Sequence, residues 1–162
     1  MRIKFNTYDV NTSGTNRYSL GNIRKKPLIV FGVNPSTANQ YVSDNTITKI
    51  NQFARLNAFD SYVVFNLYPK RATNPEDLPA ISSKIDCKKN IEVIINMLEN
   101  IHKPIIWAAW GNTILMKDYL ITCLHEIHKK TKCFNPSWVV CGKLTNLGHP
   151  RHPSRLGYKN SF

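Results

Sequence analysis

Four short apolar runs alternate with segments of helical periodicity along the 162-residue chain. The runs are rich in β-branched or aromatic residues, and they cover residues 27–33, 62–67, 104–110 and 137–141. Continuous apolar runs of this length are typical of strands that are covered on both faces, as in a parallel sheet. The sequence therefore predicts four buried strands.

Apolar residues recur at helical spacing between these runs. The predicted helices cover residues 46–58, 86–102 and 112–128. Strands that alternate with helices imply βαβ units, so the predicted fold class is α/β: three α/β/α layers around a central, mostly parallel four-stranded sheet. Residues 1–5 and 17–20 also read as extended, and the turn-like segment 11–16 allows an extra N-terminal strand pair. We expect one domain that spans residues 1–162.

Polar, glycine and proline residues cluster where the predicted strands end. These positions are Asn34, Asn66, Gly111 and the segment 142–156. In open parallel sheets, ligands bind at the carboxyl ends of the strands. The sequence therefore predicts that these four segments surround one cavity at one edge of the sheet, with Gly111 permitting close packing beneath it.

The charge of the chain favours an anionic partner. Twenty-two Lys and Arg residues oppose ten Asp and Glu residues, which gives a net charge of +12. Nucleic acid or a nucleotide is the natural partner for this excess, with a merely soluble basic protein as the alternative. The excess is concentrated at the C-terminal end, because seven Lys and Arg residues follow the last acidic residue, Glu126.

Several classes of protein are disfavoured by the sequence. No apolar run approaches the ~20 residues of a membrane span, and the N-terminal segment lacks an apolar signal-like region. We therefore expect a cytoplasmic protein, a monomer, with no membrane partner. The cysteines at positions 87, 123, 133 and 141 form no CxxC pair and are interpreted as buried free thiols. We expect no cofactor and no metal, because no carboxylate lies near His149 and His152.

Four motifs in this order resemble the uracil-DNA glycosylase superfamily. They are GVNPS at 32–36, VVFNL at 63–67, AAWG at 108–111 and HPSRL at 152–156. The chain is also similar to an uncharacterised family of short proteins from bacteria, phages and mobile elements. That similarity lies in GVNPSTA at 32–38, NLYPKRAT at 66–73 and GHPRHPS at 148–154.

The resemblance implies roles for individual residues. Asn34 falls where the superfamily positions a water molecule, and His152 falls where a histidine stabilises the departing base, so these two are the candidate catalytic residues. Asn66 falls where an asparagine reads the edge of the base. The remaining candidates are Pro35, Ser36 and Tyr41 for base or ligand binding, and Arg71, Arg151, Ser154, Arg155 and Leu156 for nucleic-acid binding.

Three departures from the superfamily bear on activity. Asn34 replaces the aspartate of the strongest uracil enzymes, and Ser36 replaces the tyrosine that excludes thymine. The stacking phenylalanine is missing, which leaves Tyr41 as its speculative substitute; base stacking is worth ~1–3 kcal/mol. We therefore expect a pseudo-glycosylase that binds nucleic acid, a nucleotide or an unidentified protein partner. Two alternatives stay open: an active glycosylase on a modified or bulkier base, and a module that binds a small phosphorylated ligand.

Overall fold

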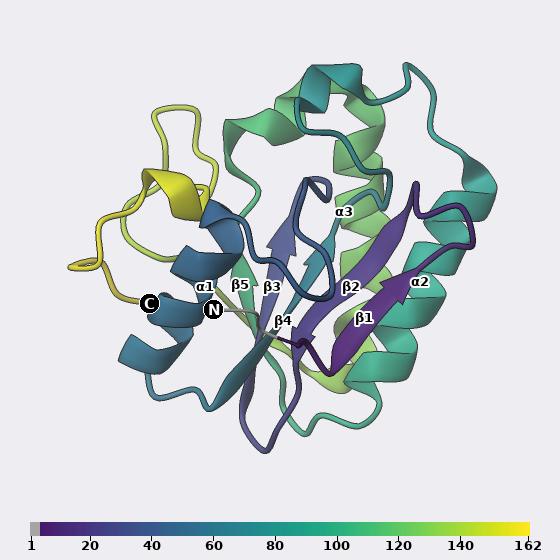
Figure 1. Cartoon of the computed structure of the whole chain (residues 1–162). Coiled ribbons are helices and arrows are strands. Elements are labelled where there is room, and N and C mark those ends of the chain that lie inside the picture. Colours follow the sequence, from purple (N-terminus) through teal and green to yellow (C-terminus); the bar gives the residue numbers. More distant parts are fainter. Residues whose placement is uncertain (1–3) are drawn as a thin grey trace.

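A computed structural model describes residues 4–162 as a twisted sheet with helices on both faces (Figure 1). The strands are β1 (Thr7–Val10), β2 (Arg17–Asn22), β3 (Pro27–Gly32), β4 (Ser61–Asn66), β5 (Ile105–Ala108) and β6 (Ser137–Val139). The α-helices are α1 (Asn45–Leu56), α2 (Lys84–Leu98) and α3 (Asp118–Thr131). Short 3-10 turns are η1 (Pro75–Asp77), η2 (Gly111–Met116), η3 (Lys132–Phe134) and η4 (Pro153–Arg155).

The sheet has six strands and is mixed, in the order β1-β2-β4-β3-β5-β6. The four strands expected from the apolar runs are present, and β4, β3, β5 and β6 pair in parallel. The sheet has two strands more than the expected four, because β1 and β2 form an antiparallel N-terminal pair beside β4, which the sequence had allowed. Residues 17–20 lie in β2 as expected, but its partner strand is β1 at residues 7–10. Within the predicted extended segment 1–5, only Lys4 and Phe5 are described, and they are not in a strand.

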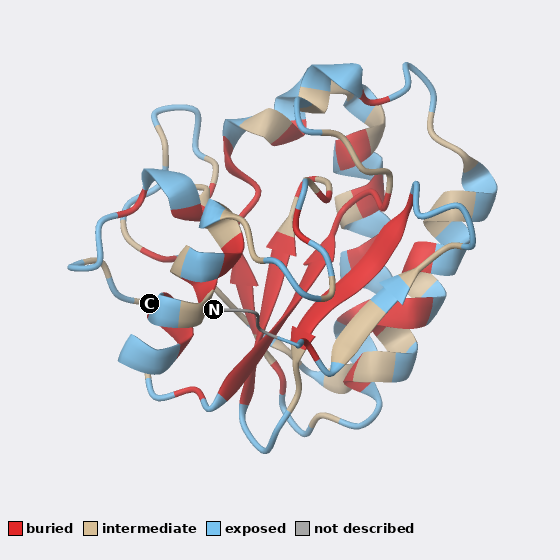
Figure 2. Ribbon diagram, viewed as in Figure 1, coloured by how far each residue is buried: buried red, intermediate tan, exposed pale blue. Residues whose placement is uncertain are grey.

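Alternate residues of the parallel strands bury their side chains on opposite faces. Ile29, Phe31, Val63, Phe65 and Ile106 pack in the core beneath α2 and α3. Leu28, Val30, Tyr62, Val64 and Trp107 pack in a second core beneath α1. Strand side chains alternate between the two faces of a sheet, so strands buried on both faces need a continuous apolar run. Figure 2 shows the central strands β3, β4 and β5 as mostly buried, between helices that are exposed on their outer sides.

The helices begin at side-chain caps where the sequence offers them. Asp44 accepts a hydrogen bond from Ile47 N at 2.9 Å to start α1, and Ser83 accepts one from Asp86 N at 3.2 Å to start α2. The single helix expected at 112–128 is wrong, because Lys117 is extended (φ −140°, ψ 128°) and separates η2 from α3. No side chain caps the start of α3, so nothing in the sequence indicated that the helix would be interrupted at Lys117.

Two further expectations concern membrane-spanning helices and the burial of the cysteines. No helix in the described part of the chain is long and apolar enough to span a membrane. The cysteines are all free, but they are not all buried: Cys133 is exposed and Cys87 is half-buried, whereas Cys123 and Cys141 are buried.

Candidate functional site

The carboxyl ends of the central strands open into a cavity of about 450 Å³. The strand order reverses at β3, because α1 follows β3 on one face while α2 follows β4 and α3 follows β5 on the other. Such a switch point leaves a crevice above the strand ends. Among the residues that line the cavity are six sequence candidates: Asn34, Ser36, Asn66, His152, Ser154 and Arg155. The predicted convergence of distant loops on one cavity is therefore confirmed.

His152 reaches the cavity because its loop packs closely on Gly111. Gly111 has a φ of +64°, and a Cβ there would lie 3.2 Å from the Cβ of His152. Only glycine combines this backbone conformation with so close an approach at little cost. The expected role of Gly111 beneath the site is confirmed.

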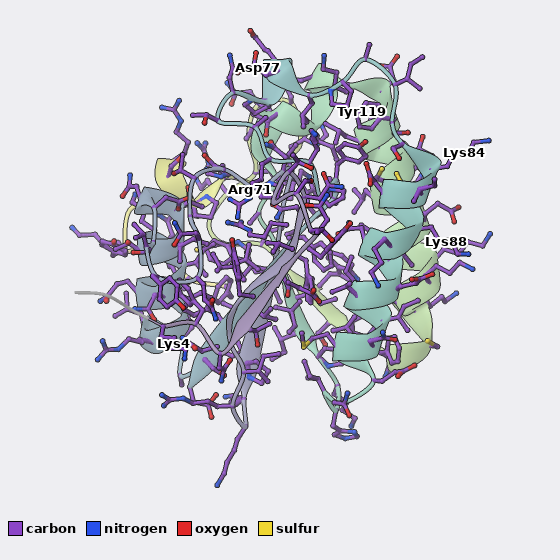
Figure 3. All side chains as sticks on the ribbon, turned by 45° about the vertical axis from the view of Figure 1, so that its right-hand side comes forward. Lys4, Arg71, Asp77, Lys84, Lys88 and Tyr119 are labelled. Atoms are coloured by element: carbon purple, nitrogen blue, oxygen red, sulfur yellow. The ribbon has the colours of Figure 1, made fainter. Side chains whose placement is uncertain are left out.

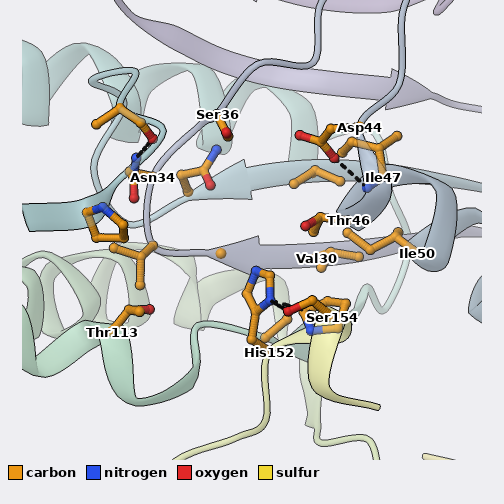
Figure 4. Close-up of a pocket in the computed structure, with 18 of the residues that line it drawn as sticks. Val30, Asn34, Ser36, Asp44, Thr46, Ile47, Ile50, Thr113, His152 and Ser154 are labelled. Atoms are coloured by element: carbon orange, nitrogen blue, oxygen red, sulfur yellow. Dashed lines mark hydrogen bonds between the residues drawn. The ribbon is translucent and has the colours of Figure 1, made fainter. Parts of the chain in front are cut away.

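The imidazole of His152 has a defined donor and acceptor. Its Nδ1 accepts from the backbone N–H of Ser154 at 3.3 Å and lies 2.8 Å from the Ser154 hydroxyl. Burial lowers the pKa of His152, and the charges of Arg155 and Lys49 lower it further against the opposing effect of Asp44. The ring is therefore neutral at pH 7 with its proton on Nε2, because Nδ1 accepts from a backbone donor. Figure 4 shows the ring pointing into the cavity.

Asn66 holds a hydrogen-bond donor that the described residues leave unused. The residue ends β4, is 3% exposed, and lies beside Gly32 at the end of β3. Its Nδ2 is buried and has no partner among residues 4–162. A buried unpaired donor costs about 1–3 kcal/mol. Seven other buried side-chain atoms of the described residues also lack a partner, and Asn66 and Arg17 are the two residues of this set that line the cavity.

Asn34 presents an oxygen to the cavity. Its Nδ2 donates to the carbonyl of Ala72 at 2.8 Å and to that of Pro35 at 3.1 Å. These two bonds fix the amide, so Oδ1 is left as an acceptor. The lining thus brings together the Asn34 acceptor, the His152 ring and Asn66, whose Nδ2 is itself buried.

Arg17 lines the same cavity, although the sequence pattern identified it only as a strand residue. It is 3% exposed; its Nη1 donates to the carbonyl of Ala38 at 2.8 Å, and its Nε has no partner among the described residues. Burial, together with the charge of Arg71, lowers the pKa of Arg17 to about 10, so it stays a cation at pH 7. The signal that could have identified it is an arginine inside an otherwise buried strand.

Arg71 does not have the exposed position that phosphate binding needs. Its Nη1 donates to the carbonyls of Ser36 (2.9 Å) and Ala38 (3.0 Å), and its Nη2 donates to the hydroxyl of Tyr8 (2.8 Å). The guanidinium thus uses these hydrogen bonds to hold the 36–38 loop in place. Arg71 supports the cavity wall, which corrects its expected role.

Four other candidates also lie outside the lining of this cavity: Arg151, which lines a second cavity, and Tyr41, Leu156 and Pro35. Tyr41 is 51% exposed and does not reach the cavity, so it does not replace a stacking aromatic residue. Leu156 is 3% exposed and packs in the core beneath α1, which does not fit a wedge that enters a nucleic acid. Pro35 is buried and shapes the loop through its carbonyl. No Phe, Tyr or Trp of the described chain lines the cavity.

A second cavity of about 430 Å³ adjoins the first at His152. It shares Thr113, His152 and Arg155 with the first cavity and is also lined by Arg151, but by no carboxylate. The Nε of Arg151 donates to the carbonyl of Lys143 at 2.9 Å, which orients its guanidinium. Among residues 4–162, no group of three or more His, Cys, Asp or Glu side chains is arranged to hold a metal ion.

The fold and the two cavities define an α/β protein with a ligand-sized site at the carboxyl edge of its parallel strands. Residues 17–154 match the family described as "Protein of unknown function (DUF1643)", and the chain belongs to this family. The match includes the Asn34 and Asn66 loops and most of the 142–156 segment. No curated protein matches the chain significantly. No solved structure does so either.

Proposed function

We propose that the first cavity binds a nucleobase, presented by a nucleic acid or a nucleotide, and that the protein is a pseudo-glycosylase that does not excise uracil. The observation that carries this proposal is the buried, unpaired Nδ2 of Asn66 in the cavity lining. An asparagine amide offers both donors and an acceptor, which suits the polar edge of a base. The Nε2–H of His152 adds a second donor for a carbonyl of the base.

Phosphate recognition belongs to the second cavity in this proposal. Arg151 and Arg155 line it with no carboxylate in the lining, and His152 lines both this cavity and the first one. Arginine pairs well with phosphate oxygens because its planar guanidinium donates two parallel hydrogen bonds. A base in one cavity and its phosphate in the other would therefore lie on either side of His152.

Two features argue against uracil excision. The residue that would position water is neutral Asn34, and loss of one electrostatic group of this kind costs on the order of 10²–10³ in rate. The lining has no aromatic ring on which a base would stack. An excision assay on single-stranded and duplex DNA that contains uracil is expected to release no base; efficient release would refute the pseudo-glycosylase.

Binding assays with DNA and with mononucleotides distinguish the possible ligands. We expect fluorescently labelled DNA to bind with an affinity that falls with salt, and Asn66→Ala and Arg155→Ala to weaken it at least tenfold. Lys88→Ala is the matched control, because Lys88 projects into solvent from α2, away from the strand ends (Figure 3). Saturable mononucleotide binding with little affinity for DNA would instead identify a small phosphorylated ligand.

A second candidate function is hydrolysis of the N-glycosidic bond of a bulkier or modified base. It is favoured by the fixed amide of Asn34, whose Oδ1 is oriented to accept a hydrogen bond from water, and by the small Ser36 in the lining. His152 would stabilise the leaving base as a neutral donor. A panel of modified bases should then show turnover that Asn34→Ala and His152→Ala abolish; turnover unaffected by both changes would refute this candidate.

A further inference from the structure

Two cysteines from different helices lie close together at a third cavity. The Sγ atoms of Cys87 on α2 and Cys123 on α3 are 3.8 Å apart. Both line a cavity of about 370 Å³ between these helices, on the face of the sheet opposite α1. Cys87 is half-buried, which leaves its sulfur open to small reagents, whereas Cys123 is 9% exposed.

We propose that Cys87 and Cys123 form a redox-active thiol pair that a peroxide converts into a disulfide between α2 and α3. The geometry carries this inference, because a disulfide needs the sulfurs to move from 3.8 Å to a bond of ~2.05 Å without a change of fold. The other two cysteines serve as an internal comparison. Cys141 is buried and Cys133 is exposed, and neither makes a sulfur–sulfur contact in the described chain.

The environment of the pair assigns a role to each sulfur. Hydrogen bonding from Cys123 lowers the pKa of Cys87 to about 7, against the opposing effects of burial and Asp86. The same contact and burial raise the pKa of Cys123. Cys87 is also the more exposed of the two, so it is assigned as the thiolate that attacks, and the buried Cys123 as the thiol that resolves.

The other titratable groups near the two cysteines do not change the roles assigned to Cys87 and Cys123. Tyr68 and Tyr119 are neutral at pH 7, because burial raises the pKa of each. Lys84 and Glu126 line the same cavity with opposite charges.

The chemistry balances with hydrogen peroxide as oxidant. The Cys87 thiolate attacks one peroxide oxygen, the O–O bond breaks, and the hydroxide leaves as water after protonation, which gives a sulfenic acid on Cys87. The sulfur of Cys123 then attacks the Cys87 sulfur, and the S–O bond breaks with release of a second water. Two thiols and one peroxide thus give one disulfide and two waters.

Oxidation of the whole chain provides the direct test. The purified protein is treated with a small excess of hydrogen peroxide, its remaining thiols are alkylated, and its peptides are analysed by mass spectrometry without reduction. We expect a linked peptide pair that contains Cys87 and Cys123, with Cys133 and Cys141 alkylated. Linkage of any other pair, or four alkylated thiols after extended exposure, would overturn the proposal.

Matched variants test the two roles. Cys87→Ser and Cys123→Ser should abolish the link, and Cys133→Ser should preserve it. In Cys123→Ser we expect a sulfenic acid at Cys87 that a dimedone probe traps, because the resolving thiol is gone. In the unmodified chain, alkylation of Cys87 should follow a pH profile centred near pH 7, and Cys123→Ala should move that midpoint upward. An unchanged midpoint, or a link that persists in Cys123→Ser, would overturn the assignment.

Discussion

Replacing Asn66 with leucine should weaken ligand binding without lowering the free energy of unfolding. Leucine has the same branching as asparagine but no polar atoms, and the Asn66 Nδ2 that it removes is buried without a partner. A buried unpaired donor destabilises a protein by about 1–3 kcal/mol, so Asn66→Leu should leave the free energy of unfolding unchanged or raise it by up to that amount. For a chain of this size, each kcal/mol moves Tm by about 2–4 °C. The same change should weaken ligand binding at least tenfold.

A control for this prediction is a buried polar group that is hydrogen-bonded. Thr131 is 1% exposed and its hydroxyl donates to the carbonyl of Ile127 at 2.8 Å. Thr131→Val removes a satisfied group and should lower the free energy of unfolding by about 1 kcal/mol. Urea denaturation of both variants, without ligand, gives the comparison. If Asn66→Leu destabilises the chain as much as Thr131→Val or more, Asn66 serves the fold and the argument for a ligand there fails.

Four further changes test the loops around the cavity. Arg71→Lys removes the planar fork that bonds the 36–38 loop and should lower the free energy of unfolding by about 1–3 kcal/mol in urea denaturation. Gly111→Ala should cost roughly 1–2 kcal/mol through its φ of +64° and should shift the NMR signals of His152; unchanged signals would contradict the close packing. Because burial lowers the pKa of His152, stability should be full above the ordinary value of 6.5 and fall as pH drops below it; His152→Gln should reduce this dependence. Lys49→Met removes the bond to the carbonyl of Leu156 (2.8 Å) and should speed hydrogen exchange at residues 154–156, with little change at α3.

The parts of the fold that the sequence predicted share a simple physical basis. Buried parallel strands need apolar side chains on both faces, so their runs stand out without any knowledge of the partners. The polar residues at the ends of those runs must then meet at one edge of the sheet. Asn34, Asn66 and His152 could be assigned to one cavity for this reason, although His152 comes 118 positions after Asn34.

The errors concern side chains whose environment depends on tertiary contacts. Arg17 lies in a strand pattern, and only the approach of the 36–38 loop brings it to the cavity. Leu156 follows a polar, basic loop that reads as exposed, but Lys49 on α1 donates to its carbonyl and its side chain packs beneath that helix. The extended Lys117 could not be foreseen, because no proline or glycine marks the break between η2 and α3.

The contacts between the 34–38 loop and residues 71–72 change where a ligand phosphate should be sought. Asn34 donates to the carbonyl of Ala72, Ala72 N donates to the carbonyl of Pro35 at 3.0 Å, and the Arg71 guanidinium donates to the loop carbonyls. These reciprocal bonds join the GVNPSTA and NLYPKRAT motifs into one wall of the cavity, so Arg71 is an internal support. Of the arginines singled out from the sequence, Arg151 and Arg155 are then the ones left to meet a phosphate, and both line the second cavity with His152. A ligand that bridges the two cavities would place its base on one side of this histidine and its charge on the other.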